Sequence, residues 1–142
     1  MILVTTFQFF LIIFIVSYLS VNMIYLIRIY PVKEELVAYP YISVCVPARN
    51  EERDIKNCVE SLLSQDYPNF EVIVVDDNSN DNTAKIVCSM TEQYPNLIFV
   101  AGVRLAAGWT VKPYALHQAY QRSRGQYLLF TDADLTYQSH AL

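Results

Sequence analysis

The chain contains Tyr127-Leu128-Leu129-Phe130-Thr131-Asp132-Ala133-Asp134, an apolar run that ends in two carboxylates one residue apart. A short apolar run of this kind is typical of a fully buried strand. A strand that ends in Asp-x-Asp delivers two carboxylates to the carboxyl edge of a sheet, where open α/β folds bind ligands. Paired oxygen donors suit Mg²⁺ or Mn²⁺, which share their coordination with waters and substrate phosphates. Because Asp also favours turns and helix starts, the motif alone leaves both interpretations open.

The composition indicates one ordinary domain preceded by an apolar segment. The 142 residues are 54% hydrophobic and 17% charged, against about 45–50% and 25% in average soluble chains. No charged side chain occurs within residues 2–27. About 20 apolar residues cross a bilayer as a helix, so residues 1–30 are predicted to form a transmembrane anchor. A cleavable signal peptide is disfavoured because a basic start and a small-residue cleavage site are missing.

The few charges near this segment predict its orientation. Arg28 and Lys33 follow the predicted span, and the positive-inside rule then places the rest of the chain on the cytoplasmic side of the cell membrane. Residues 31–41 are predicted to be a linker. The net charge of −4 argues against a nucleic-acid partner. Buried, reduced thiols are expected at the three cysteines, which have no metal-ligand spacing: Cys45, Cys58 and Cys88.

Strand-like and helix-like patterns alternate after the linker. The predicted strands are 42–46, 70–75, 97–100 and 127–131, and the predicted helices are 51–64, 83–94 and 113–123. Asn50 is the expected cap of the first helix, and Gly125 is expected to close the third. This order predicts an α/β domain with a mostly parallel sheet and right-handed crossovers.

Polar residues follow three of these strands: 47–51, 76–79 and 132–134. Because carboxyl ends of parallel strands share one edge, these residues are expected to converge on one ligand. Arg49 and Lys112 are the nearby cations that a phosphate-bearing ligand would need. Taken singly, each residue has an ordinary explanation as a turn, a helix-dipole partner or a surface charge. Neither a Rossmann Gly-x-Gly-x-x-Gly nor a P-loop motif is present.

Four motifs in order resemble family 2 glycosyltransferases: residues 44–52, 74–83, 108–113 and 132–134. The resemblance covers residues 42 to about 138 and implies a GT-A-like fold, of which residues 42–142 would be the donor-binding half. The Gly108-Trp109-Thr110 stretch with Lys112 most resembles membrane-associated members, including hopanoid-associated and ceramide-type transferases.

The resemblance also implies the ligands. The donor would be a nucleotide-diphosphate sugar, with a UDP-sugar favoured, and the acceptor a lipid or a saccharide. One of Asp76 and Asp77 would hold the base, and Asp132 and Asp134 would bind the Mg²⁺ or Mn²⁺ that bridges the phosphates. The residues implied to bind the donor are Pro47, Ala48, Arg49, Glu51, Asp76, Asp77, Lys112 and Asp132.

Family members continue well past Asp-x-Asp with acceptor-binding strands and a carboxylate that acts as general base. Residues 135–142 have no room for these parts. The resemblance therefore implies a truncated domain with no assignable catalytic base, and the chain alone is expected to turn over no donor.

Three alternatives stay open. Asp132-Ala133-Asp134-Leu135-Thr136 also fits the Asp-x-Asp-x-Thr signature of haloacid-dehalogenase-type phosphohydrolases, in which Asp132 would be the nucleophile. In that family, however, the motif follows the first strand. Val74-Val75-Asp76-Asp77-Asn78 resembles the acidic strand end of a receiver module, although on the wrong strand. A non-catalytic, membrane-bound remnant is the third alternative.

Overall fold

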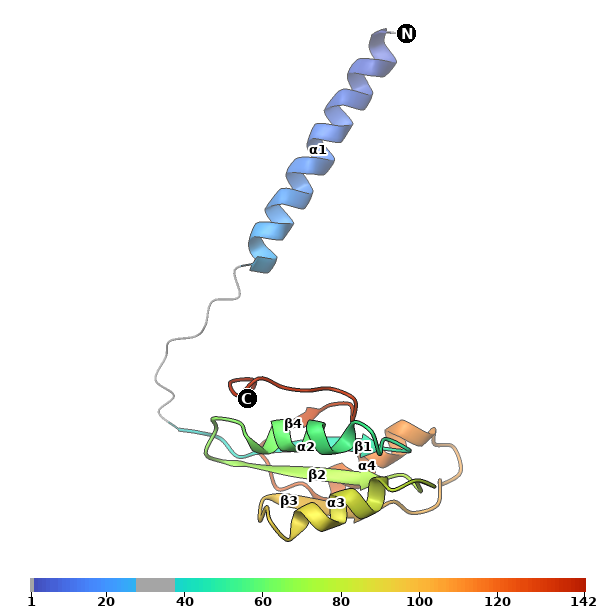
Figure 1. The fold of residues 1–142 in the computed structure, drawn as a ribbon. Coiled ribbons are helices and arrows are strands. Elements are labelled where there is room, and N and C mark those ends of the chain that lie inside the picture. Colours follow the sequence, from blue (N-terminus) through green and yellow to red (C-terminus); the bar gives the residue numbers. More distant parts are fainter. Residues whose placement is uncertain (1, 28–37) are drawn as a thin grey trace. The chain divides into compact units, whose positions relative to one another are not determined.

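A computed structural model describes residues 2–27 and 38–142 of the chain (Figure 1). The chain divides into two compact units, residues 1–36 and residues 37–142. The first contains α1 (Ile2–Ile27). The second contains β1 (Ile42–Ala48), α2 (Ile55–Leu63), β2 (Phe70–Asp76), α3 (Thr83–Thr91), β3 (Leu97–Ala101), α4 (Val111–Arg122) and β4 (Tyr127–Phe130). The predicted alternation of strands and helices is therefore confirmed.

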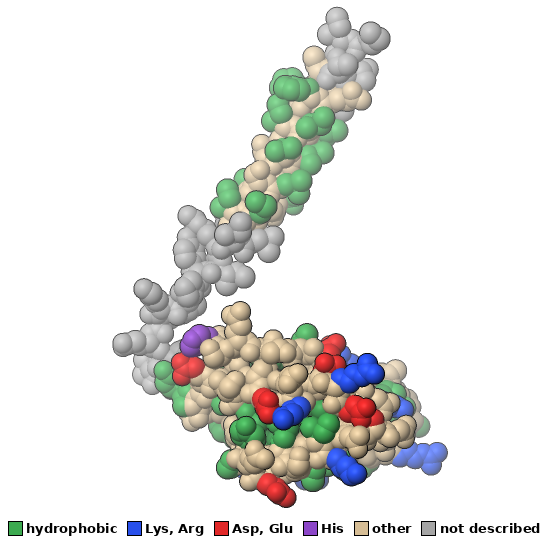
Figure 2. Space-filling model, viewed as in Figure 1, with side chains coloured by type: hydrophobic (Ala, Val, Ile, Leu, Met, Phe, Trp, Pro, Cys, Tyr) green, Lys and Arg blue, Asp and Glu red, His purple; other side chains and the backbone are tan. Residues whose placement is uncertain are grey.

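Helix α1 has 26 residues and carries no acidic residue in its first turn and no basic residue in its last. The structure describes the side chains of residues 6 and 8–24 of this helix. Hydrophobic side chains lie along the helix (Figure 2). Many of them are exposed, Phe10 and Phe14 among them. Over the described side chains of the chain, no helix is both long enough and apolar enough to cross a membrane. The anchor expected over residues 1–30 is therefore not confirmed, and residues 1 and 28–30 of it lie outside the described ranges.

The four strands of the second unit form one parallel sheet in the order β3-β2-β1-β4. Strand β2 is buried along its whole length, and β1 is nearly so. Central strands of a parallel sheet read as continuous apolar runs because helices cover both faces. This explains why the sequence shows runs rather than an alternation of apolar and polar residues in these strands.

Successive residues of a strand point to opposite faces, so the sheet separates two cores. On one face the larger core packs β1 and β2 residues such as Val46 and Val74 against α2 and α3. On the other face Cys45, Ile73 and Val75 pack against Ala115 and Ala119 of α4. Helices α2 and α3 therefore cover one face, and α4 covers the other.

The start of the first helix of this unit differs from the prediction. Helix α2 begins at Ile55 rather than Glu51, and its N-terminal flanking residue is Asp54, which makes no side-chain cap hydrogen bond. Asn50 is not a cap, since it has a left-handed backbone with φ of 58°. The backbone N–H groups of residues 50, 51 and 52 instead donate to Ser79 Oγ, Thr83 Oγ1 and Asp81 Oδ2. These tertiary hydrogen bonds satisfy donors that a helix start would leave unpaired.

Gly125 also has a different role from the expected helix closure. The residue that follows α4 directly is Ser123, and a Cβ added at Gly125 would lie only 2.4 Å from the backbone N of Ser43. The N–H groups of Arg124 and Gly125 donate to Glu71 Oε1 and Ser43 Oγ, each at 2.8 Å. Close packing and buried hydrogen bonds thus bring β4 beside β1.

Candidate donor-binding site at the carboxyl edge of the sheet

A cavity of about 240 Å³ lies at the carboxyl edge of the sheet. It is formed by the end of β1 and the loop after it, the end of β2, the start of α4 and the turn after β4. Its lining residues are Pro47, Ala48, Arg49, Glu51, Asp77, Val111, Lys112, Ala115, Asp132, Ala133 and Asp134. The structure therefore brings together every predicted site residue except Asp76. Sequence reasoning missed Val111 and Ala115, whose four-residue spacing on a helix is the signal that could have found them.

Parallel pairing explains this convergence. Ala48 is paired with Asp76 in the ladder of β1 and β2, and the N–H of Asp77 donates to Ala48 O at 2.8 Å. On the other side of β1, the N–H of Thr131 donates to Cys45 O at 3.1 Å, which extends the pairing of β4 by one residue. The strands thus end side by side, and the residues that follow them meet.

Two ion pairs lie within the cavity lining. Arg49 Nη1 is 3.4 Å from Asp77 Oδ2, and the side chain of Asp77 is only 9% exposed against 51% for Arg49. Lys112 Nζ pairs with Asp132 Oδ1, with both side chains half exposed. Of the two pairs, the exposed Lys112–Asp132 pair contributes little to stability. Their effect here is to place a cation beside each of two carboxylates.

Asp76 and Asp77 are neighbours with different environments. Asp76 is 7% exposed and does not line the cavity; its Oδ2 accepts a hydrogen bond from the N–H of Ser79 at 3.2 Å, and its Oδ1 is buried without a partner. Its carbonyl O accepts from the N–H of Gly102 at 2.8 Å. Asp76, the last residue of β2, thus accepts hydrogen bonds from the turn and loop around it, and only Asp77 lines the cavity.

The acidic residues of the site crowd one another. Burial, followed by repulsion from Asp134, Asp54, Asp81 and Asp132, raises the pKa of Glu51. No group of three or more His, Cys, Asp or Glu side chains that could hold a metal ion is found among the described residues. Asp132 and Asp134 supply at most a partial set of protein ligands, which suits Mg²⁺ or Mn²⁺ because such ions complete their shell with waters and phosphate oxygens. The crowding of carboxylates beside Glu51 is the feature that a cation would relieve.

The loops after β1 and β2 are joined to each other, which the sequence did not predict. Asn50 Oδ1 accepts from the N–H of Asn80 at 2.8 Å, and Glu52 Oε2 accepts from the N–H and the side-chain amide of Asn82. With the three contacts made by the N–H groups of residues 50–52, these hydrogen bonds join the two loops. Arg49, Glu51 and Asp77 are consequently held on a cross-linked frame.

The cysteines are only partly as expected. Cys45 and Cys58 are buried free thiols, whereas Cys88 is exposed, so its predicted burial is wrong. Cys58 Sγ lies 3.5 Å from the carbonyl O of Asp132, directly beneath the Asp-x-Asp turn. Burial raises the pKa of Cys58 to about 11, and the nearby Asp134 and Asp132 add to the shift. A neutral thiol therefore supports this turn.

A second cavity of about 270 Å³ adjoins the first and shares Lys112 and Asp132 with it. Its other lining residues are Leu116, Phe130, Thr131, Leu135 and Tyr137. The apolar members of this set come from α4, β4 and the turn after β4. The charged site therefore borders an apolar cavity.

Comparison with known proteins adds to this geometry. The model of the family glycosyl transferase family 2 matches residues 43–142 of the chain. Over 100 residues the chain is 39% identical to the beta-monoglucosyldiacylglycerol synthase of Synechocystis sp., covering 69% of this chain and 20% of that protein.

Two solved structures are similar to the chain. Staphylococcus aureus TarS 1-349 in complex with UDP-GlcNAc is 36% identical with a TM-score of 0.55, covering 66% of this chain and 26% of that one. The mannosyltransferase PcManGT of Pyrobaculum calidifontis in complex with GDP-Man and Mn²⁺ is 31% identical with a TM-score of 0.58, covering 71% of this chain and 29% of that one. The chain thus spans between a fifth and a third of these proteins' lengths.

Proposed function

Because this chain belongs to glycosyl transferase family 2, we propose that residues 42–142 bind a nucleotide-diphosphate sugar with a divalent metal ion, as the donor-binding half of a GT-A glycosyltransferase. The observation that carries the proposal is the single cavity in which Asp77, Lys112, Asp132 and Asp134 meet. The activity would be transfer of the sugar to a hydroxyl group of an acceptor. The fit to this family also makes the phosphohydrolase alternative at Asp132 unnecessary.

Asp77 is the proposed partner of the nucleotide base. Its carboxylate faces the cavity and would accept a hydrogen bond from the ring N–H of uracil, while Asp76 faces the turn. Arg49 pairs with Oδ2 of Asp77, and the side-chain amide of Asn78 donates to Oδ1 at 3.5 Å, a long contact that the N–H of the base would replace. Pro47 and Ala48, at the end of β1, would form the wall beside the nucleotide. The UDP-GlcNAc complex of TarS supports a UDP-sugar as donor.

Lys112, Asp132 and Asp134 are the proposed phosphate and metal ligands. Lys112 would turn from Asp132 toward the donor phosphates, because a diphosphate offers more negative charge than one carboxylate. Asp134, with Asp132, would hold Mg²⁺ or Mn²⁺, and the Mn²⁺ in the PcManGT complex supports this assignment. When bound, the ion would offset the charge that develops on the departing nucleoside diphosphate.

A lipid is the acceptor that we favour, with a saccharide as the second candidate. The Synechocystis relative is named as the synthase of a glucosylated diacylglycerol. The second cavity would admit an apolar portion of an acceptor beside the donor, through Leu116, Phe130 and Leu135.

Membrane attachment through residues 1–30, with a single pass and the domain on the cytoplasmic side, is also part of the proposal. It rests on the uncharged run at residues 2–27, on Arg28 and Lys33 after it, and on the exposed apolar side chains of α1. A retained apolar helix would keep the domain near a lipid acceptor.

The test measures donor binding to the purified chain by calorimetry. The donors are UDP-glucose and UDP-GlcNAc, and each is titrated once with Mn²⁺ and once with a chelator. We expect Mn²⁺ to strengthen binding to the wild-type chain and to have no effect on Asp134→Ala. The matched control is Asp66→Ala, which removes an exposed aspartate that contacts His140 outside the site. Equal affinity with and without Mn²⁺ in the wild-type chain would contradict the metal role, and no binding of either donor would contradict the donor site.

A further inference from the structure

Helix α4 carries a row of aromatic side chains on the side that faces away from the sheet. The ring of Trp109, just before the helix, stacks on His117 at 4.8 Å and lies 5.5 Å from Tyr114, while His117 lies 6.3 Å from Tyr120. The buried residues of α4 are Ala115, Gln118 and Ala119, on the opposite side of the helix. We call Trp109, Tyr114, His117 and Tyr120 the aromatic face of α4.

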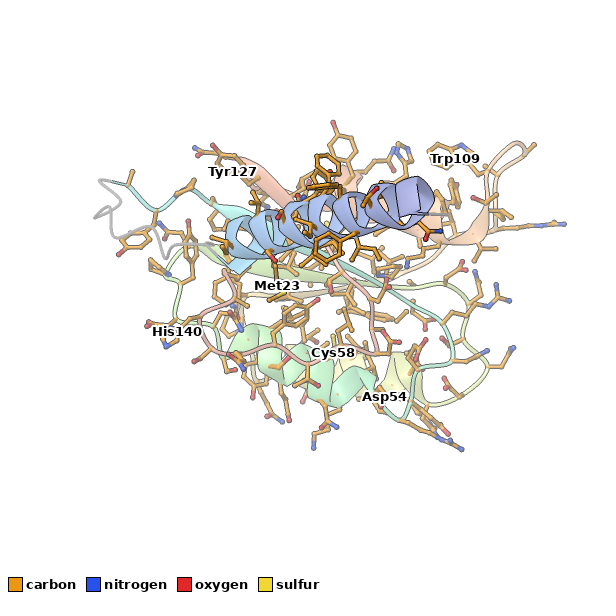
Figure 3. The ribbon with its side chains drawn as sticks, turned by 90° about the horizontal axis from the view of Figure 1, so that it is seen from above. Met23, Asp54, Cys58, Trp109, Tyr127 and His140 are labelled. Atoms are coloured by element: carbon orange, nitrogen blue, oxygen red, sulfur yellow. The ribbon has the colours of Figure 1, made fainter. Side chains whose placement is uncertain are left out.

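The two ends of this face, Trp109 and Tyr120, are solvent-exposed, Tyr114 and His117 between them are partly exposed, and the exposed surface continues onto the loop before the helix. Trp109 is 42% exposed and Tyr120 is 56% exposed. In the preceding loop, Val103 is 55% exposed and Leu105 is 43% exposed. The N–H of Val103 donates to Gln118 Oε1 at 2.9 Å, which fixes this loop against α4. In Figure 3, Trp109 lies on the opposite side of the unit from Asp54 and Cys58 of the α2 side.

The charged side chains in and around α4 are all positive. No Asp or Glu occurs between residues 93 and 131, although the whole chain has a net charge of −4. Arg104 lies in the loop before α4, Arg122 in its last turn and Arg124 just after it; all three are exposed. Within the described ranges, none of these arginines takes part in an ion pair.

The other face of the sheet is different. Helices α2 and α3 and the loops before them carry charges of both signs, and Figure 2 shows Lys, Arg, Asp and Glu side chains interspersed on the visible face. The α4 side therefore combines the aromatic residues with three arginines and no nearby acidic residue in sequence, whereas Arg53, before α2, is flanked by Glu51, Glu52 and Asp54. A mixed-charge surface suits solvent, whereas a basic surface with exposed Trp and Tyr suits a boundary between water and a negatively charged apolar phase.

We propose that the aromatic face of α4, with Val103, Leu105 and the three arginines, binds the surface of an anionic lipid bilayer. Tyr and Trp rings have an apolar body and a polar group, which is the property that places them at membrane interfaces. Arginines near such a surface are attracted by the anionic head groups. The inference does not rest on the donor site or on the anchor at residues 1–30, because it concerns the second unit alone.

The position of α4 gives this binding a consequence. Val111 and Lys112, in the first turn of the helix, line the donor cavity. A bilayer that contacts Trp109 would therefore lie beside the mouth of that cavity, where a lipid acceptor could reach the donor without leaving the membrane.

Trp109 reports on this contact directly because it is the only tryptophan of the chain. The full chain is reconstituted into vesicles of phosphatidylcholine with or without phosphatidylglycerol, and its fluorescence is recorded with brominated lipids and with aqueous acrylamide. We expect a blue shift, quenching by brominated lipids and protection from acrylamide, all stronger with phosphatidylglycerol and weaker at high salt. An anchored domain whose α4 faces water would show none of these changes.

Variants separate this surface from the rest of the molecule. Arg104→Gln and Arg122→Gln are each expected to lower the ratio of membrane-contacting to water-exposed Trp109 in anionic vesicles, as measured by brominated-lipid quenching, about fivefold, the factor that corresponds to about 1 kcal/mol per basic residue. The matched control is Lys85→Gln on α3, on the other face of the sheet, which is expected to have no effect. Two results would overturn the proposal: equal losses for Lys85→Gln and the arginine variants, or a concentration-dependent blue shift without lipid, which would show that a second copy covers this face.

Discussion

Arg49 Nη1 lies 3.4 Å from Asp77 Oδ2, and this ion pair joins the loop after β1 to the end of β2 within the cavity lining. The contact orients a carboxylate that is almost buried while its partner is half exposed. Arg49 thus holds one oxygen of Asp77 without closing the cavity.

The first prediction concerns Asp77 itself. Asp77→Asn removes the charge that Arg49 pairs with and replaces one acceptor oxygen by an amide that cannot accept the base N–H. Since a hydrogen bond to a charged group contributes about 1.5–3 kcal/mol, affinity for UDP is expected to fall at least about tenfold. Isothermal titration of UDP measures this. Asp66→Asn, at an exposed site, is the control, and an unchanged UDP affinity in Asp77→Asn would remove Asp77 from the base site.

The second prediction is a pH dependence at Glu51. Burial, and next the charge of Asp134, raises the pKa of Glu51 in the folded chain. The folded state therefore holds this proton more tightly than the unfolded state, so ionisation destabilises the fold. The cost is absent below the unfolded pKa of about 4.3 and fully present above the raised pKa.

Glu51→Gln is consequently expected to raise the Tm at pH 7 and to leave it nearly unchanged near pH 3.5, below about 4.3. Thermal unfolding at both pH values measures this, with the exposed Glu92→Gln as control. An equal gain at both pH values would show that packing, and not charge, is responsible.

The third prediction concerns a carboxylate far from the cavity. Glu71 is 2% exposed, and its Oε1 accepts from Ser43 Oγ at 2.6 Å and from the N–H of Arg124 at 2.8 Å. Glu71→Ala leaves both donors without this acceptor and is expected to cost about 3 kcal/mol of unfolding free energy. Urea unfolding of this variant and of Glu60→Ala, on the surface of α2, provides the comparison; similar small losses in both would show that the Glu71 contacts contribute little.

The fourth prediction concerns close packing at the start of β4. A Cβ at Gly125 would lie 2.4 Å from the backbone N of Ser43, which cannot move without disturbing β1. Gly125→Ala is expected to destabilise the domain by about 1–3 kcal/mol, as overpacking of this kind does. The neighbouring exposed Gln126→Ala serves as control in the same denaturation experiment. A stability unchanged by Gly125→Ala would mean that β4 is less tightly held than the structure indicates.

The fifth prediction concerns thiol reactivity. Burial raises the pKa of both Cys45 and Cys58 to about 11, while Cys88 is exposed. Iodoacetamide at neutral pH is expected to modify one thiol per folded chain and three after unfolding, as counted by mass spectrometry. Cys88→Ser should abolish the fast reaction. Rapid labelling of Cys58 would show that the turn at Asp132 opens readily.

The local pattern of apolar and polar residues was sufficient to predict most of the fold. The apolar runs of β1, β2 and β4, and the helical spacings between the strands, predicted a parallel sheet, because long crossovers between buried strands leave few other arrangements. The convergence of Asp77, Asp132 and Asp134 followed from the same rule, since strand ends of a parallel sheet share one edge. Here the tertiary structure agreed with what the sequence already implied.

The tertiary structure alone decided the finer questions. Asp76 and Asp77 are equivalent in sequence pattern, and only the turn after β2, with Asn78 at φ of 55°, directs one inward and the other toward the cavity. Asn50 looked like a helix cap but bonds to the loop at residues 79–80. These outcomes depend on contacts between residues about thirty positions apart, which periodicity within one segment does not encode. The sequence by itself determined which strands form and which of their ends carry charge, whereas the packing of loop against loop determined which of those charges face the cavity.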